Sequence, residues 1–252
     1  MLKQKKVLIT GGSRGIGRAI AIALSRAGAD IFITYCNDVK SARAVADEVK
    51  SLGSEAWYER VNLAYKDEIE QLFETLATRF DHLDIFISNA VAATLKPLDK
   101  LPLRHWEYIL NANLTAFFVC SRMAAKMMEG RNGTILGVSS LGSRIAFPGY
   151  AALGAAKAGM EALVKYMAVE WVEKNINVNM ICAGPVETQA LKAFQGAGAD
   201  VMNLKKSFVD RTPLKRIAVP DDLTGLVTFL CSDDAGWIRG QTIVIDGGFS
   251  LT

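Results

Sequence analysis

Short apolar runs alternate with longer amphipathic segments along most of the chain. Runs rich in β-branched residues predict strands at residues 6–10, 30–35, 83–88, 133–140, 176–182 and 241–246, and a further strand is expected over 54–61. Segments with the period of a helix fill most of the intervals. Such alternation is typical of a parallel sheet with crossover helices. We therefore expect an α/β fold, a single Rossmann-type doubly wound domain over residues 1–252 with about seven parallel strands and helices on both faces.

Three segments add to this pattern. Residues 189–212 contain Gly and Ala between the last two predicted strands, and we interpret them as a substrate lid within the domain. A pair of ordinary surface helices is the alternative. Two helical segments, about 103–128 and 150–173, carry Ala, Met and Leu on more than one face. Such helices need burial beyond the sheet, which predicts an oligomer.

Composition excludes several classes of function. The net charge of +3 is too small, and the Lys and Arg residues too dispersed, for a nucleic-acid partner. The apolar run near the N-terminus is too short for a signal peptide or a membrane span, so we expect a soluble, cytoplasmic metabolic enzyme without a membrane partner. The four cysteines and two histidines lack the spacing of metal ligands, and no metal site is expected.

The sequence TGGSRGIG at residues 10–17 predicts a dinucleotide site. It directly follows a predicted strand and opens a predicted helix at 16–28. Glycines allow a sharp turn there and let the N–H groups at the helix start approach a pyrophosphate. The predicted cofactor-binding residues of this loop are Gly11, Ser13, Arg14, Gly15, Ile16 and Gly17.

The choice between NAD and NADP depends on the end of the second predicted strand. An NAD site usually has an acidic residue there, about 20 residues after the glycines. This sequence has Cys36 and Asn37 instead, and neither repels a 2′-phosphate. Arg14 could pair with that phosphate and Lys40 could assist, which predicts NADPH. Asp38 is a possible late acid that would favour NAD.

The strongest chemical signal is the pair Tyr150 and Lys157, with six residues between them. On a helix, a separation of seven positions returns to within about 20° of the starting direction, so the two side chains would share one face. A phenol and an ammonium group on one face are suited to reduction, with Tyr150 as the proton donor. We expect the charge of Lys157 to favour the tyrosinate by lowering the pKa of Tyr150. The alternative role for Tyr150 is packing at a helix start.

Six ordered motifs span the chain: TGGSRGIG, SNA at 88–90, NANL at 111–114, VSS at 138–140, AAKAG at 155–159 and IRGQTIVIDGG at 238–248. Together they resemble the short-chain dehydrogenase/reductase family. The active site of that family combines Asn, Ser, Tyr and Lys. The resemblance implies that Asn113 steadies the lysine through water, that Ser140 is the catalytic serine and that Lys157 binds the nicotinamide ribose. Leu153 stands where the family keeps its tyrosine, and Tyr150 is the candidate replacement.

The resemblance also implies further cofactor contacts. Thr188 is placed to bond the carboxamide or a phosphate, and the backbone of Val186 to orient the nicotinamide ring. Two departures bear on the adenosine half: Val91 replaces the usual glycine after SNA, and Asn62 stands where an adenine-binding Asp is common. The full set outside the glycine loop is Cys36, Asn37, Asn62, Leu63, Asn89, Ala90, Lys157, Gly184, Val186 and Thr188.

Within the family, the spacing of Tyr150 and Lys157 resembles that of enoyl-acyl-carrier-protein reductases. The segments SNAVAATLKPL, VSSLGS and GYAALGAAKAGMEAL look like the bacterial enoyl reductase III type, which uses NADPH. Conjugate reduction places hydride on C3 of a 2-enoyl thioester while negative charge develops on the thioester oxygen, so the acid must lie farther from the nicotinamide. Moving a tyrosine three residues along a helix displaces its anchor by about 4.5 Å. The resemblance therefore implies an NADPH-dependent enoyl-ACP reductase of fatty-acid synthesis.

Two other functions stay open. One is a 3-oxoacyl-ACP or other carbonyl reductase of the same family, with Tyr150 repositioned by the turn at Pro148 and Gly149. The other is a non-catalytic NADP-binding protein, since Leu153 cannot donate a proton.

The resemblance also implies partners. Family members assemble as homotetramers through helix bundles, and acyl chains in this pathway arrive on an acidic acyl-carrier protein. We hypothesise that a basic cluster in and after the lid docks this carrier, although a solvated helical face is the alternative. The cluster comprises Lys192, Lys205, Lys206, Arg211, Lys215 and Arg216.

Overall fold

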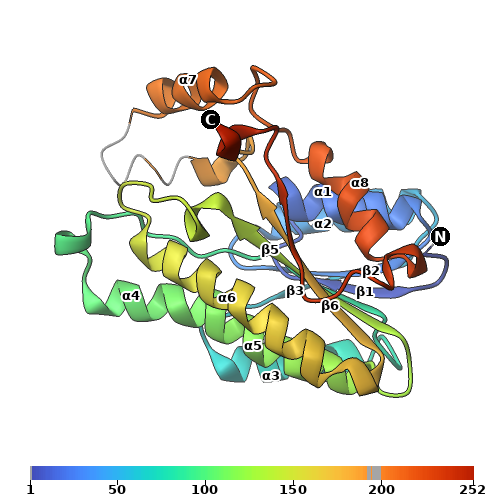
Figure 1. Cartoon of the computed structure of the whole chain (residues 1–252). Coiled ribbons are helices and arrows are strands. Elements are labelled where there is room, and N and C mark those ends of the chain that lie inside the picture. The colour runs from blue at the N-terminus through green and yellow to red at the C-terminus, as the bar shows by residue number, and fades with distance from the viewer. Residues whose placement is uncertain (1, 192–193, 195–199) are drawn as a thin grey trace.

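A parallel sheet lies between two layers of helices in the computed structural model, which describes residues 2–191, 194 and 200–252 (Figure 1). Its seven strands run in the order β3-β2-β1-β4-β5-β6-β7, and every neighbouring pair is parallel. The predicted fold class is therefore confirmed. The strands are β1 Lys6–Ile9, β2 Asp30–Tyr35, β3 Ala56–Arg60, β4 Ile85–Ser88, β5 Gly133–Ser140, β6 Ile176–Ala183 and β7 Thr242–Ile245.

The helices divide between the two faces of the sheet. Buried side chains of α1, α2 and α8 pack on one face, and those of α3, α5 and α6 pack on the other. Among the described helices, none is long and apolar enough to cross a lipid bilayer. The bounds are α1 Gly15–Arg26, α2 Val39–Ser51, α3 Lys66–Ala77, α4 Leu103–Leu110, α5 Ala116–Met127, α6 Ala151–Glu170, α7 Val201–Arg211 and α8 Asp221–Leu230.

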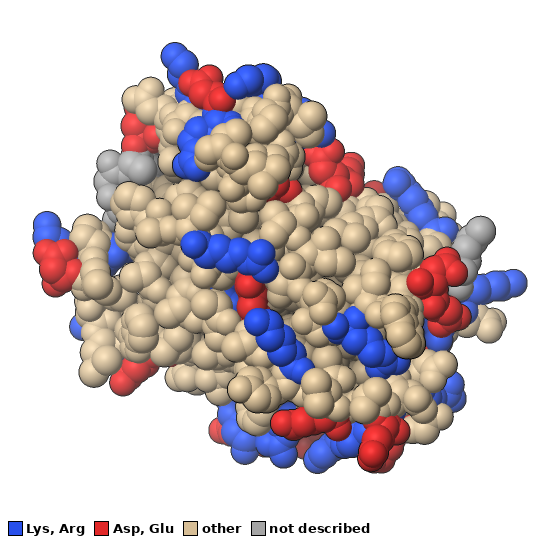
Figure 2. Space-filling view, viewed as in Figure 1, with Lys and Arg blue, Asp and Glu red and all other residues tan. Residues whose placement is uncertain are grey.

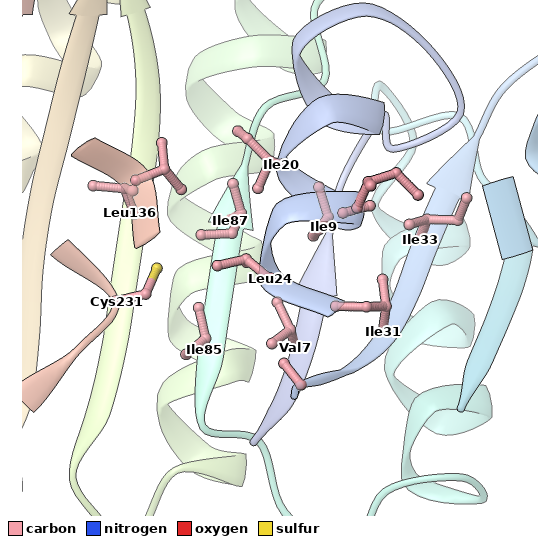
Figure 3. Packing of buried hydrophobic residues seen from close by; sticks show 14 of the residues in the cluster. Val7, Ile9, Ile20, Leu24, Ile31, Ile33, Ile85, Ile87, Leu136 and Cys231 are labelled. Carbon is pink, nitrogen blue, oxygen red and sulfur yellow. The ribbon is translucent and has the colours of Figure 1, made fainter. Parts of the chain in front are cut away.

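Helix α1 packs on the central strands of the sheet and fixes the position of the loop before it. Ile20 and Leu24 are four residues apart, so they lie on one helix face, and both are fully buried. Figure 3 shows them over Val7, Ile9 and Ile87 of the central strands. Because β1 is buried between two helical layers, its sequence is almost continuously apolar. This packing holds the loop between β1 and α1 at the carboxyl ends of the central strands.

The predicted helix over 103–128 is interrupted in its middle. Helix α4 runs into a π-helical turn, Asn111–Thr115, and then into α5. Such turns are uncommon and are often found at functional sites. Here the turn carries Asn113, whose Nδ2 donates to Ile109 O at 2.8 Å.

The strand order reverses direction between β1 and β4. In open α/β sheets, ligands bind in the crevice beyond the carboxyl ends of the strands at this kind of switch point. Helix α7 lies near the C-terminus and away from the sheet, beyond this end of the strands (Figure 1). The hydroxyl of Thr252 donates to Arg211 O at 2.8 Å, which ties the chain end to α7.

Candidate active site

A cleft of about 1060 Å³ opens at the carboxyl ends of the strands. It brings together nearly all the residues that the sequence predicted for the site. The two exceptions are Gly17, which lies beneath the loop, and Asn113, which is buried behind the cleft wall. The predicted lid is described only in part, because Lys192 and residues 193 and 195–199 lie outside the described residues.

Two glycines give the loop after β1 its sharp turn. Gly11 and Gly15 have φ of +66° and +54°, a conformation that favours glycine. A Cβ on Gly11 would lie 2.8 Å from Ala90 Cα, and one on Gly17 would collide with Gly11 O. The backbone is therefore bare where α1 begins, as a pyrophosphate on helix-terminal N–H groups requires.

Asn89 holds this loop from the neighbouring strand. Its Nδ2 donates to Thr10 O and to Gly11 O, each at 3.0 Å. The hydroxyl of Thr10 accepts from the backbone N–H groups of Asn89 and Ala90 at 3.1 and 3.2 Å. Asn89 thus shapes the loop, a structural role beside its predicted cofactor contact.

The residues after β6 approach the glycine loop from the other side. A Cβ on Gly15 would lie 3.3 Å from Thr188 Cγ2, so the two loops face each other across the cleft. Val186 is buried and pairs with Ala218 in an isolated parallel bridge. Thr188 and Gly184 line the cleft as predicted.

The acidic residue after β2 is already engaged in the fold. Asp38 caps α2, accepting from Ser41 Oγ at 2.7 Å and from Ser41 N at 3.0 Å. These hydrogen bonds lower the pKa of Asp38. Its capping role weighs against the alternative that Asp38 binds the ribose of NAD. Arg14 lines the same end of the cleft, where its Nη1 donates to Gln189 Oε1 at 3.0 Å.

Tyr150 meets Ser140 at the bottom of the cleft. Its hydroxyl donates to Ser140 Oγ at 3.1 Å. Tyr150 is the N-cap residue of α6 rather than a residue within the helix. Its ring lies against Gly142 and stacks on Phe194, with centroids 5.9 Å apart. Loop contacts, more than a shared helical face with Lys157, therefore set the position of the hydroxyl.

Lys157 is fully enclosed within the same site. The side chain is buried, and its Nζ donates to Val138 O at 2.7 Å. Burial lowers the pKa of Lys157 to about 8. The expectation that this lysine lowers the pKa of Tyr150 is wrong for the protein alone, because burial raises that pKa. Val138 precedes Ser140 by two strand residues, about 6.6 Å along β5, so Lys157 and Tyr150 have separate anchors.

Leu153 occupies the place of the usual acid. It is 3% exposed and packs with Ile109 and Ala152, and it also lines the cleft. An aliphatic side chain there supplies no proton. Tyr35 and Tyr108 also line the cleft, but Tyr150 is the tyrosine whose hydroxyl is bonded to Ser140.

Asn113 is held by two backbone carbonyls, and its link to Lys157 through water stays a prediction. Its Nδ2 donates to Ala92 O and Ile109 O, each at 2.8 Å. Its Oδ1 is buried and has no hydrogen-bond partner among the described residues. A buried acceptor of this kind is suited to a water molecule.

Three phenylalanines of the cleft were not predicted from the sequence. Phe147 contacts the Tyr150 ring edge-on at 6.1 Å and contacts Phe208 at 6.2 Å, and Phe194 lies 6.5 Å from Phe208. Together they form an apolar wall beside the Tyr150 hydroxyl. Two of them belong to the predicted lid, and aromatic residues there were the only available signal.

Comparison with known proteins identifies a family model that matches almost the whole chain. Residues 11–250 match the family described as enoyl-(acyl carrier protein) reductase. A short-chain dehydrogenase of Burkholderia cenocepacia, solved in complex with NADP, superposes with a TM-score of 0.90 at 30% identity, covering 99% of both chains. The chain belongs to the short-chain dehydrogenase/reductase family. As a member of this family it is an oxidoreductase with a site for NAD(P).

Curated relatives in the family include reductases of two kinds. A 1-cyclohexenylcarbonyl-CoA reductase of Streptomyces collinus is 35% identical over 244 residues, which is 97% of this chain and 86% of the relative. A 3-oxoacyl-[acyl-carrier-protein] reductase of Staphylococcus epidermidis is 31% identical, covering 98% of this chain and 99% of the relative. Further relatives of 31–32% identity carry the second name.

Proposed function

We propose that the protein reduces the C2=C3 double bond of 2-enoyl thioesters with NADPH, as an enoyl-ACP reductase. One observation carries this proposal. The place one helical turn before Lys157 holds Leu153, while Tyr150 is bonded to Ser140 and anchored apart from the lysine. An acid set away from the ribose-binding lysine suits conjugate reduction, because hydride adds to C3 while negative charge develops on the thioester oxygen attached to C1.

The side chains of the cleft have distinct parts in this reaction. A nicotinamide cofactor, when bound, supplies the hydride. Lys157 would hold its ribose, and Tyr150 would donate to the thioester oxygen, stabilising the charge that develops there. Burial raises the pKa of Tyr150, which keeps the phenol protonated at neutral pH and able to donate. Phe147 and Phe194 offer an apolar surface to the acyl chain.

Preference for NADPH rests on charge at the adenosine end of the cleft. Arg14 lies there with its guanidinium, the group that pairs best with a phosphate. Asp38, the acidic residue nearest in sequence to the end of β2, is occupied as a helix cap. The Burkholderia cenocepacia relative in complex with NADP supports the same preference.

Reduction of 3-oxoacyl thioesters is the second candidate. The names of the relatives favour it, because most of those cited above are 3-oxoacyl-[acyl-carrier-protein] reductases. The adjacent hydroxyls of Tyr150 and Ser140 could also polarise one ketone oxygen. The name of the Streptomyces collinus relative supports the first candidate, since it describes a carbon–carbon double bond beside the carbonyl.

The two candidates separate in one assay. Crotonyl and acetoacetyl thioesters are offered side by side, and oxidation of NADPH is followed by its absorbance. The proposal expects turnover of the crotonyl thioester at a kcat/KM well above that of the acetoacetyl thioester. Consumption of the acetoacetyl thioester alone would assign the protein to carbonyl reduction. Identification of the saturated product by mass spectrometry completes the test.

We also propose that the acyl chain arrives on an acidic carrier protein, although the basic cluster is smaller than the sequence suggested. Lys205 is paired with Glu187 at 2.7 Å, and Arg216 is paired with Asp222. Arg211 lies over the Phe249 ring at 4.2 Å. Figure 2 shows acidic side chains among the basic ones at α7. Lys206 is exposed and is the lysine of α7 without an ion pair among the described residues.

Charge reversal tests the docking proposal. Lys206→Glu is expected to raise KM for a carrier-linked substrate and to leave KM for the CoA-linked substrate unchanged, since docking depends on surface charge. Lys50→Glu, on the distant helix α2, is the matched control. Equal kinetics of Lys206→Glu and the wild type on the carrier-linked substrate would reject this docking site.

Assembly as a homotetramer remains a proposal as well. Helices α5 and α6 form an apolar groove of about 400 Å³ that includes Phe118, Leu163 and Tyr166. Phe118 and Tyr166 are 40% and 67% exposed in the isolated chain, which favours a second copy as their cover. Light scattering gives the mass in solution, and Tyr166→Arg should lower it.

A further inference from the structure

A carboxylate behind the cleft joins the two halves of the active site. Glu161 lies on α6 four residues after Lys157, and therefore on the same helix face. Its side chain is 14% exposed. It is a lone acidic residue in the apolar middle of α6, and this was the sequence signal that could have marked it.

Within the described part of the chain, every side-chain hydrogen bond that Glu161 accepts comes from the segment at the end of β5. Oε1 accepts from Ser139 Oγ and from Ser143 Oγ, each at 2.6 Å. Oε2 accepts from Arg144, from Nε at 3.2 Å and from Nη2 at 3.0 Å. Hydrogen bonds to a charged acceptor are stronger and more directional than neutral ones. One carboxylate thus fixes residues on both sides of Ser140.

The same segment positions the reacting hydroxyls. Ser140 Oγ accepts from Tyr150, and it also accepts from Gly142 N at 3.2 Å. The Tyr150 ring lies directly against Gly142. Ser143 Oγ lies 2.8 Å from Ser140 O, so its single proton can serve that carbonyl or Glu161. A shift of the segment would therefore move both hydroxyls together.

Charge links Glu161 to the lysine as well. Burial lowers the pKa of Lys157 to about 8, and the carboxylate of Glu161 opposes that fall. Glu161 therefore favours the charged form of Lys157 from one helical turn away, while its oxygens hold the segment that carries Ser140.

We propose that Glu161 is a positioning residue, which sets the distance between Lys157 on α6 and the Ser140–Tyr150 pair by holding residues 139–144 against that helix. The inference rests on the proposed reduction at Tyr150, but it does not depend on which thioester is reduced. Either substrate needs its hydrogen-bond donors at a fixed place relative to the ribose.

A double-mutant cycle tests this coupling. Glu161→Gln keeps the size of the side chain but replaces one acceptor oxygen by an N–H₂ donor, so the amide cannot accept from both Arg144 and the serines. We expect kcat/KM to fall by about tenfold or more, since small misplacements of catalytic groups are costly. In a Ser140→Ala background the same change should have little further effect, because residues that act as a unit are not additive. If Glu161→Gln lowers kcat/KM by the same factor in the wild-type and the Ser140→Ala backgrounds, the proposal is overturned.

A spectroscopic readout separates positioning from stability. In protein labelled at the tyrosine Cζ carbon, Tyr150→Phe assigns the Tyr150 resonance. Glu161→Gln should shift this resonance, whereas Glu170→Gln, an exposed acidic residue on the same helix, should not. An unchanged Tyr150 resonance in folded Glu161→Gln would reject the inference even if turnover were lost.

Two further arms keep the test decisive. If Glu161→Gln does not fold, Arg144→Gln cuts the same link from a more exposed side chain, 39% exposed, and should reproduce the resonance shift. Turnover is measured on both the crotonyl and the acetoacetyl thioester. Activity on the acetoacetyl thioester alone would reject the proposed function and still measure the role of Glu161.

Discussion

The hydroxyl of Tyr150 donates to Oγ of Ser140 at 3.1 Å, and this bond places the phenol beside the end of β5. The backbone of Tyr150 belongs to the start of α6, where Gly154 N donates to its carbonyl at 2.7 Å. The phenol is therefore anchored at both ends, by a helix cap and by a strand end. Its reach depends on loop geometry that helical spacing alone does not describe.

Removal of this hydroxyl should abolish most turnover and spare cofactor binding. Tyr150→Phe is expected to lower kcat by about 10²–10⁴-fold, the usual contribution of a positioned acid. The dissociation constant for NADPH should stay within about twofold, because the contact is with the thioester and not the cofactor. Tyr65→Phe, an exposed tyrosine that does not line the cleft, is the control. Equal and negligible turnover before and after Tyr150→Phe would instead support a non-catalytic NADP-binding protein.

The platform under the Tyr150 ring gives a second prediction. A Cβ on Gly142 would overlap the ring, so Gly142→Ala must displace either Tyr150 or the segment. Overpacking of this kind costs about 1–3 kcal/mol in the free energy of unfolding. The fall in kcat should be larger than the loss of folded protein explains, because the Tyr150 hydroxyl is displaced. Gly225→Ala is the control, since no atom lies within 4 Å of its Cβ. In helix α8 that change should be neutral or stabilise by about 0.5–1 kcal/mol.

A tyrosine restored at position 153 should favour reduction of the carbonyl group over reduction of the double bond. Leu153→Tyr, combined with Tyr150→Phe, places the phenol one turn before Lys157 and removes the displaced one. We expect the ratio of acetoacetyl to crotonyl turnover to rise by at least about tenfold, because the donor then lies nearer the ribose-binding lysine. Leu153 is 3% exposed, so circular dichroism must first show that the larger ring is accommodated. A ratio that does not rise in the folded double variant contradicts the proposed division of roles.

The sequence predicted the fold far better than the details of the site. Apolar periodicity located all seven strands to within two residues at each end, because strands buried on both faces have strongly apolar sequences. Motif spacing also predicted that Ser140, Tyr150 and Lys157 share one site, and all three line the cleft. It could not show that burial would outweigh charge at Tyr150, since burial is a property of the packed chain. Glu161 stood out as a lone acidic residue in the apolar middle of α6, but the sequence could not show its partners, which come from a segment about 20 residues away.

Cofactor preference should depend on a single guanidinium. Arg14→Ala is expected to weaken NADPH binding by about tenfold or more and to leave NADH binding within about twofold, since only NADPH carries the 2′-phosphate. Gln189→Ala removes the present partner of Arg14 without touching its charge, and it serves as the control. Isothermal titration with both nucleotides provides the comparison. Equal losses for the two nucleotides would mean that Arg14 supports the loop and not the phosphate.

Lys157 should impose a limit on activity at high pH. Burial lowers its pKa from 10.5 to about 8, so the ammonium group loses its proton as the pH rises through about 8. If the charged form holds the ribose, kcat/KM should fall along an alkaline limb near that pH. The raised pKa of Tyr150 places the loss of the phenol proton at higher pH, so the two events do not coincide.

The same pKa shift predicts how Lys157 affects stability. Below about pH 8 both the folded and the unfolded chain carry its proton, and the cost of burying the charge is present in full. Between about pH 8 and 10.5 the unfolded chain binds a proton that the folded chain has lost, so stability rises with pH through this window. Above it both forms are neutral and the cost has gone. The free energy of unfolding of Lys157→Met minus that of the wild type should therefore become less positive, or more negative, from pH 8 towards pH 10.5. Lys165→Met, an exposed lysine on the same helix, should show no such trend, and a flat difference for Lys157→Met would mean that the ammonium group keeps its ordinary pKa in the folded protein.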